Sequence, residues 1–214
     1  MRQTVAEEMG ETFPEAETLC APGMKDLSGG KGAIALVPAA GISARVLDNM
    51  KMAVQSAFGE EALLVMGAEG EGWVCPSGGP GRQVPASCLI TRLAPLRKAF
   101  ERVLGVVDTG LSHPGVNHVF GFTDPESRVS VMSLYHLGRK GEAPAKVARR
   151  ASKTAIHELG HSYGLPHCRD HRCVMFFSFN LTDTDYKDSG FCKKCGKELS
   201  MRLNPGVHER KEVC

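Results

Sequence analysis

The stretch HELGHSYGLPH occupies residues 157–167 and begins with the pattern HExxH. On a helix this spacing places His157 and His161 one turn apart on the same face, so that both imidazoles can reach one zinc ion. Glu158 then lies beside the ion without being a ligand. That is the place of a general base that activates zinc-bound water, so the pattern predicts hydrolytic chemistry.

The residues that follow HExxH predict a third ligand. Gly164 can adopt the left-handed conformation that ends a helix, and Pro166 cannot continue one. The chain can therefore turn and bring His167 back to the same ion. Three histidines leave the fourth zinc position open to water, which is the layout of a catalytic zinc. The alternative is a helix with two ordinary core or surface histidines, but HExxHxxGxxH is far more specific than HExxH alone.

Four of the eight cysteines cluster just after these histidines. They form two pairs whose thiolates can surround a second zinc ion, and a site with four protein ligands is closed to water and therefore structural. Such a site would attach the last helix to the loop that carries His167. A disulfide interpretation requires an oxidising compartment. The expected ligands are Cys168, Cys173, Cys192 and Cys195, whereas we expect free thiols at Cys20, Cys75, Cys88 and Cys214.

The composition restricts the class of protein. With 214 residues, 42% of them hydrophobic, the chain is long enough for one substantial domain, and its net charge of +2 does not indicate a nucleic-acid or membrane-surface protein. No apolar run approaches the length of a spanning helix, and the acidic N-terminal stretch has no hydrophobic leader. We therefore predict a cytoplasmic location, a loosely ordered segment over residues 1–30 and one domain over residues 31–214.

The hydrophobic pattern predicts alternating strands and helices. Strands are expected at 33–37, 62–66 and 102–107, an antiparallel pair at 116–122 and 129–137, and helices at 43–59, 84–93 and 145–163, with a last helix that carries Cys192 and Cys195 and runs to about Leu203. This order predicts an α/β (α+β) fold, in which helices pack on a twisted mixed sheet. The basic cluster Lys146, Arg149, Arg150 and Lys153 is interpreted as a solvated helix face rather than a phosphate site.

These motifs resemble the metzincin zinc metallopeptidases, and in particular their archaemetzincin branch. The resemblance is carried by HExxHxxGxxH, by Cys168 directly after His167, by Cys173-Val174-Met175 and by a later CxxC. It extends upstream to about residue 30 and ends near residue 203, with further matching stretches at 104–108, 114–117, 119–121 and 133–135. Between Met175 and Cys192 there are 16 residues, one fewer than is usual in the family, which shifts the loop but keeps all four cysteines.

The resemblance implies a zincin-like fold, two zinc ions and a role for each residue of the motif. His157, His161 and His167 would bind the catalytic zinc, Glu158 would be the base, and Met175 would form a hydrophobic floor below the ion without binding it. The predicted function is the hydrolysis of peptide bonds in a peptide or protein substrate by a monomeric intracellular enzyme. The alternatives are a catalytically silent zinc-binding interaction module on the same fold, and a nucleic-acid binder built on the four cysteines.

Three further interpretations concern the substrate. Strand 129–137 can pair with an extended peptide by β-addition, which recognises backbone rather than side chains. The phenylalanines that follow Met175 either line the pocket for the residue after the cut or belong to the core. Tyr186 either assists a developing oxyanion or is an ordinary loop residue.

Overall fold

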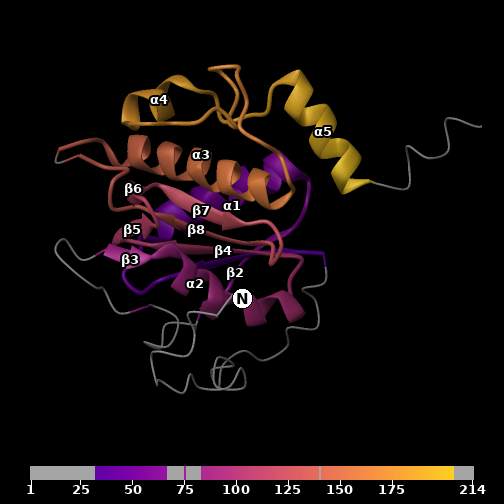
Figure 1. Cartoon of the computed structure of the whole chain (residues 1–214). Coiled ribbons are helices and arrows are strands. Elements are labelled where there is room, and N and C mark those ends of the chain that lie inside the picture. Colours follow the sequence, from indigo (N-terminus) through magenta and orange to yellow (C-terminus); the bar gives the residue numbers. More distant parts are fainter. Residues whose placement is uncertain (1–31, 67–74, 76–82, 140, 205–214) are drawn as a thin grey trace, which may run out of the picture.

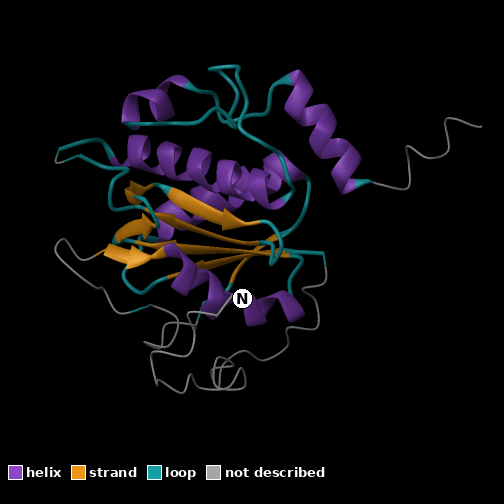
Figure 2. Cartoon of the chain, in the orientation of Figure 1, coloured by secondary structure: helices purple, strands orange, loops and turns teal. Residues whose placement is uncertain are grey.

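The computed structural model describes residues 32–66, 75, 83–139 and 141–204. The loosely ordered segment predicted for residues 1–30 lies outside these ranges, and so do Cys20 and Cys214. The described chain is layered, with the strands between helices on both sides (Figures 1 and 2). The predicted mixed sheet with packed helices is therefore confirmed.

The helices and strands alternate along the chain much as the hydrophobic pattern predicts. The strands are β1 (Ile34–Pro38), β2 (Ala62–Leu64), β3 (Gln83–Pro85), β4 (Arg102–Val107), β5 (Gly110–His113), β6 (Val116–Val119), β7 (Gly121–Asp124) and β8 (Val129–Ser133). The helices are α1 (Ala44–Phe58), α2 (Ala86–Leu93), the 3₁₀ helix η4 (Ala94–Lys98), α3 (Pro144–Ser162), α4 (Leu181–Tyr186) and α5 (Lys193–Leu203). Among these described helices, none combines the length and the apolar character needed to cross a membrane.

The main sheet has the strand order β2-β1-β4-β8-β7. Its first four strands run parallel, and β7 runs antiparallel to β8. Every residue of β1, β4 and β8 is buried, because helices cover both faces of the sheet. In the described part of the chain, β7 pairs on one side only and therefore forms a free edge of this sheet.

Successive side chains of the central strands enter two separate cores. In β1, Ile34 packs into the core that α1 and α3 share, whereas Ala35 packs into the core that contains α2. Figure 1 shows α1 and α3 on one face of the sheet and α2 on the other. The small residues Ala151 and Ala155 of α3 are completely buried and let this helix approach its neighbours closely. The helix that carries HExxH is thereby fixed to the sheet.

The region around the predicted antiparallel pair differs from the expectation. The prediction of one strand over 116–122 is wrong, because this segment divides between two sheets: β6 pairs with β5 in a three-stranded sheet, and β7 pairs with β8. The strand predicted over 129–137 ends at Ser133, whose hydroxyl accepts a hydrogen bond from the N–H of Tyr135 at 3.0 Å and so favours a local turn. The helix predicted over 84–93 starts only after Pro85, since the preceding residues form β3.

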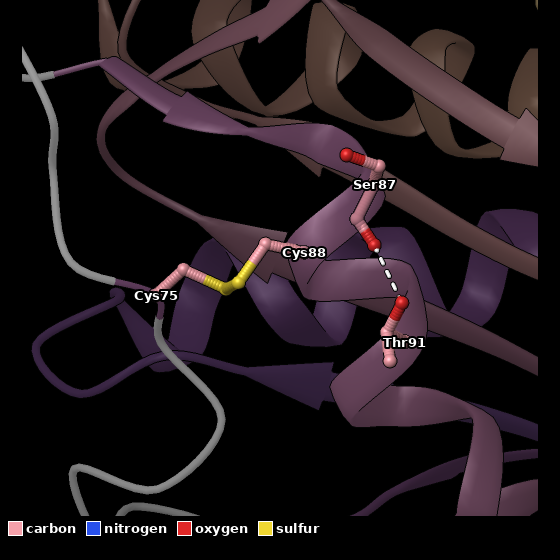
Figure 3. Close-up of a disulfide and its surroundings, with 4 residues drawn as sticks. All are labelled: Cys75, Ser87, Cys88 and Thr91. Carbon is pink, nitrogen blue, oxygen red and sulfur yellow. Dashed lines mark hydrogen bonds between the residues drawn. A yellow bond between two sulfur atoms is a disulfide. The ribbon is translucent and has the colours of Figure 1, made fainter. Parts of the chain in front are cut away.

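Two of the cysteines expected to be free are bonded to each other. Cys75 and Cys88 form a disulfide, with their Cα atoms 6.2 Å apart, that ties the segment at Cys75 to the first turn of α2 (Figure 3). In the same helix, the Thr91 hydroxyl donates to the carbonyl of Ser87 at 3.0 Å. The expectation of free thiols at these two positions is therefore wrong, because it rested on an assumed reducing compartment and not on the distance between the residues.

The interpretation of the basic cluster as a solvated face is wrong for two of its members. Arg150 is only 2% exposed, and its guanidinium binds both Glu142, at 2.6 and 3.0 Å, and Asp185, at 2.7 Å through each of two nitrogens. Lys153 is also buried and donates to the carbonyls of Thr184 and Asp185. These contacts attach α4 and the loop before α3 to the side of the HExxH helix.

We expect the contacts of Arg150 with Glu142 and Asp185 to make the protein less stable as the pH falls into the acid range. The hydrogen bonds from Arg150 lower the pKa of Glu142 and of Asp185 to about 2. A carboxyl whose pKa is lower in the folded state stabilises the fold above its unfolded pKa and loses this contribution as the pH falls through the folded value. The denaturant midpoint should therefore fall as the pH is lowered from about 4.5 toward 2.

The matched comparison for this prediction is Asp185→Asn with Asp48→Asn, since Asp48 is an exposed acid on α1. Asp185→Asn should flatten the acid dependence of the midpoint, whereas Asp48→Asn should leave it as in the wild type. Equal acid dependence in all three proteins would contradict the assignment.

Candidate active site

The three predicted histidines converge on one point. The Nε2 atom of His161 lies 3.1 Å from Nε2 of His157 and 3.1 Å from Nε2 of His167. His157 and His161 lie one turn apart on α3, as their spacing predicts. The two Nδ1 atoms face the backbone carbonyls of Val174 at 2.9 Å and Leu165 at 2.8 Å. Since a carbonyl can only accept, each Nδ1 carries the proton, and each Nε2 lone pair points to the common centre.

A tight turn after α3 brings His167 to this centre. Gly164 has a φ of +80°, its N–H donates to the carbonyl of His161, and the N–H of Leu165 donates to that of Gly160. These are the two hydrogen bonds of a Schellman motif, which ends a helix with a left-handed residue. The positive φ favours glycine at this position, whereas the Arg202 guanidinium, which would lie 2.6 Å from an added Cβ atom, is the end of a flexible exposed side chain. The predicted reversal of the chain is thus present.

The three imidazoles are in the form that binds metals. Burial lowers the pKa of His157 well below its usual value, lowers that of His161 to about 4, and also lowers that of His167. All three are therefore neutral at pH 7. A separation of 3.1 Å suits nitrogens that each lie about 2.0–2.1 Å from one zinc ion, so the residues present fit the metal.

Glu158 lies beside the triad in a buried position. Burial raises its pKa to about 7, against the opposing effects of a hydrogen bond from Thr123 and of the charge of Lys187. The Thr123 hydroxyl lies 2.8 Å from Glu158 Oε2, which holds that oxygen in place. On the other side, a Cβ atom at Gly121 would lie 2.5 Å from Glu158 Cγ. Edge strand β7 therefore packs directly against the carboxylate and fixes its orientation.

We expect Gly121→Ala to lower kcat roughly 10- to 100-fold, because the added methyl group must displace Glu158 and misplaced catalytic groups lose about this much rate. The zinc content should not change, since the atoms nearest to the added methyl group belong to Glu158 and not to the three histidines. Gly190→Ala is the matched control, because a Cβ there would meet nothing within 4 Å. Peptide cleavage by both variants measures the effect, and equal rates would contradict the role assigned to β7.

Met175 forms the buried base of the site. It is fully buried and packs so closely on α3 that any side chain at Gly160 would collide with its sulfur. The preceding residue, Val174, supplies the carbonyl that orients His157. Met175 thus packs against the helix that holds the first two histidines.

A cavity of about 1000 Å³ opens onto the triad and Glu158. Phe177 and Phe179 line it and are exposed, with the ring of Phe177 4.9 Å from that of His167 and 4.6 Å from that of Phe179. These two side chains therefore line the cavity and are not part of the core, while a contact with the residue after the cut stays a prediction. Phe176 instead packs on His171 outside the lining. Tyr186, the last residue of α4, also lies outside the lining and contacts Arg172, so the cavity gives no support to an oxyanion role for it.

The strand next to the cavity is not the predicted one. β8 is paired on both sides, with β4 and with β7, and cannot accept a further strand. The prediction that 129–137 pairs with the substrate is therefore wrong. β7 has the free edge, and its residues Gly121, Phe122 and Thr123 line the cavity.

Two residues of the site had no signal in the sequence. Thr123 contacts Glu158 because β7 packs against α3, and this packing joins residues that are distant in the sequence. Lys187 lies in a polar, acidic stretch that suggests solvent, yet it is 3% exposed and lines the cavity. Burial lowers its pKa to about 8, and the charge of Glu158 opposes this shift.

The four predicted cysteines form a second cluster. Their sulfur atoms all lie within 4.8 Å of one another, with Cys168 Sγ 3.8 Å from Cys192 Sγ. The latter distance suits two thiolates that each lie about 2.3 Å from a zinc ion, so this set also fits the metal. The N–H groups of Asp170 and Cys192 point to sulfur atoms of the cluster, which favours thiolates. Cys192 precedes the first residue of α5 rather than lying within it, so the helix starts one residue later than predicted.

The cluster connects α5 to the loop that bears His167. Cys168 directly follows His167, and its N–H donates to the carbonyl of Met175 at 2.9 Å. Cys173 and Cys195 are buried in the same core as Met175. The loop that bears His167, the segment of Met175 and helix α5 therefore meet at the four sulfur atoms.

Comparisons with known proteins agree with this arrangement. Residues 94–201 match the model of peptidase family M54. An archaemetzincin of Pyrococcus abyssi is 40% identical over 128 residues, which is 57% of this chain and 68% of the relative. The crystal structure of an archaemetzincin from Methanopyrus kandleri superposes with a TM-score of 0.70 at 29% identity, covering 82% of this chain and 97% of that one. The archaemetzincin of Archaeoglobus fulgidus, whose structure is a complex with malonate, has a TM-score of 0.67 at 25% identity and covers 78% and 99% of the two chains.

Proposed function

The chain belongs to peptidase family M54 and is a zinc metallopeptidase, and we propose that it hydrolyses peptide bonds with Glu158 as the general base. His157, His161 and His167 would hold the catalytic zinc. The observation that carries this proposal is the convergence of three Nε2 atoms, at 3.1 Å from one to the next, beside a buried carboxyl that lines the same open cavity.

The residues around the cavity have different roles in the proposed hydrolysis. When bound, zinc supplies a Lewis acid that polarises the peptide carbonyl and makes water more acidic. Glu158 accepts the proton of the attacking water and donates it to the leaving amine. Thr123 holds one oxygen of this carboxylate, which leaves Oε1 for the proton transfer. Met175 supports α3 from below without binding metal.

Edge strand β7 would align the substrate. Its outer N–H and C=O groups have no strand partner among the described residues, so an extended peptide can add to them. Such pairing recognises the backbone and leaves the choice of side chains to the cavity. Phe177 and Phe179 would then contact the residue that follows the cut.

The four-cysteine cluster would hold a second, structural zinc. Four protein ligands fill the coordination of the ion and leave no place for substrate. Its ligands would be Cys168, Cys173, Cys192 and Cys195, which join α5 to the loop of His167. The peptidase domain would comprise residues 31–214.

We expect two zinc ions per chain by elemental analysis. Cleavage of a peptide library should be lost with a zinc chelator and return when zinc is added. His161→Gln should remove one ion, because it deletes a ligand of the histidine site alone. One ion in the wild type would contradict the structural zinc. Two ions without cleavage of any library peptide would contradict the peptidase and favour a silent zinc-binding module.

We further propose that the enzyme acts as a monomer on peptides in the cytoplasm. The Cys75–Cys88 pair provides the test of this compartment, because the cytosol usually keeps thiols reduced and the two cysteines would be thiols there. Fractionation of cells together with the oxidation state of the two cysteines decides between the locations.

A further inference from the structure

Lys187 is a buried cation in the wall of the active-site cavity, and none of the steps above uses it. Its side chain is 3% exposed, and its ammonium donates to the carbonyl of Phe176 at 3.1 Å. An ammonium group has three donors, so this contact leaves two. Among the ion pairs of the described residues, none includes Lys187. The charge therefore lacks a partner at close range.

The acidic groups that face Lys187 are bound elsewhere. Glu158, Cys173 of the four-cysteine cluster and Asp183 act on its charge from a longer distance, and Lys153 repels it. Asp183 accepts from the N–H groups of Phe179 and Asn180 at the start of α4. Glu158 is held by Thr123. A buried charge is costly unless it is paired, so the site is complementary to an anion that arrives from outside.

The fold holds Lys187 in a fixed place. It is the residue directly after α4, and its N–H donates to the carbonyl of Asp183. That helix is attached to α3 through Arg150 and Lys153. Thr154 and Thr184 line the same cavity. A rigid cation in a cavity with apolar walls gives strong selection for an opposite charge, because little solvent competes with the contact.

We propose that Lys187 is a specificity residue that binds a carboxylate of the substrate next to the cleaved bond. The proposal rests on the peptidase function above and names its substrate class: peptides with an acidic group at the cut. The carboxylate can belong to an Asp or Glu side chain or to the C-terminus of the peptide. Both present the same chemistry to the ammonium.

The test compares peptides that differ only in this charge. Twin peptides carry Glu or Gln on either side of the cleaved bond, and a second pair ends one residue after the bond as the free acid or the amide. In one of these pairs, we expect the wild type to cleave the acidic peptide with a kcat/KM about 10- to 100-fold higher than that of its neutral twin. Lys187→Met should bring this ratio within about twofold while cleavage of the neutral twin persists. Lys98→Met, an exposed lysine on η4, should keep the wild-type ratio.

A binding measurement separates this proposal from the peptidase function. In the Glu158→Gln background, calorimetry should show tighter binding of the favoured acidic peptide, and adding Lys187→Met should abolish the difference. If the wild type cleaves the acidic and the neutral member of each pair with equal kcat/KM, the carboxylate site is overturned but the peptidase function stands. If Lys187→Met lowers kcat/KM by the same factor for acidic and neutral peptides, the carboxylate site is also overturned, because the lysine would then support Glu158 rather than select substrates. If no peptide is cleaved, the peptidase proposal fails, and the calorimetric comparison still decides the role of Lys187.

Discussion

Glu158→Gln should reduce kcat by about 10²- to 10⁴-fold, the usual effect of losing a general base. Gln has nearly the same shape and can still accept the hydrogen bond from Thr123, so the neighbouring strand should stay in place. It cannot take a proton from water. KM should change little, because the carboxylate acts on the reacting water and not on the bound peptide. Steady-state cleavage of a library-derived peptide measures both constants.

The zinc content of Glu158→Gln is the necessary control. It should equal that of the wild type, since the three nitrogens that converge belong to other residues. Glu61→Gln, which changes an exposed acid remote from the cavity, should cleave at the wild-type rate. A Glu158→Gln enzyme that keeps its zinc and most of its activity would remove Glu158 from the mechanism.

Cys195→Ser should release one zinc ion and destabilise the protein by about 3 kcal/mol or more, which corresponds to a fall in Tm of roughly 6–12 °C. Cys195 is buried in the core that also contains Leu199 and Met175. Loss of its thiolate opens the metal site and leaves the other three sulfur atoms close together in an apolar environment. Activity should fall as well, because Cys168 adjoins His167. Calorimetric melting and metal analysis measure the two effects.

Cys88→Ser is the matched control for this experiment. It removes the sulfur contact of the partly buried Cys88 by breaking the disulfide with Cys75, and it touches neither cluster. It should therefore keep both zinc ions. If Cys195→Ser also keeps two ions, or melts like the wild type, the four cysteines do not form a structural metal site.

The parts of the molecule that sequence predicts well are those that depend on neighbours along the chain. HExxH needs only a helix to bring His157 and His161 together, and Gly164 needs only its own φ to reverse the chain. The parallel strands β1 and β4 are predicted nearly residue for residue, because both of their faces are buried and their apolar runs are continuous. Local chemistry is sufficient for these elements.

The errors arise where burial or strand pairing depends on residues that are distant in the sequence. Arg150 resembles a surface residue until Glu142 and Asp185, the latter 35 positions away, meet it from two sides. β8 has the sequence of a strand, but which strand forms the sheet edge depends on how β7 folds back onto it. Lys187, about which no prediction was made, is likewise buried through the packing of α4. In each of these cases the contacting residues belong to another element.

The direct adjacency of His167 and Cys168 has a consequence for how the apoprotein matures. One peptide bond connects the two clusters, so occupation of either centre restricts the backbone of the other. His167 is the exposed member of the triad, whereas two of the four cysteines, Cys173 in the loop and Cys195 near the start of α5, are buried. An ion held by the four sulfur atoms would therefore hold His167 in place beside the other two imidazoles and raise their affinity for metal, so the filling of the two proposed centres would be cooperative.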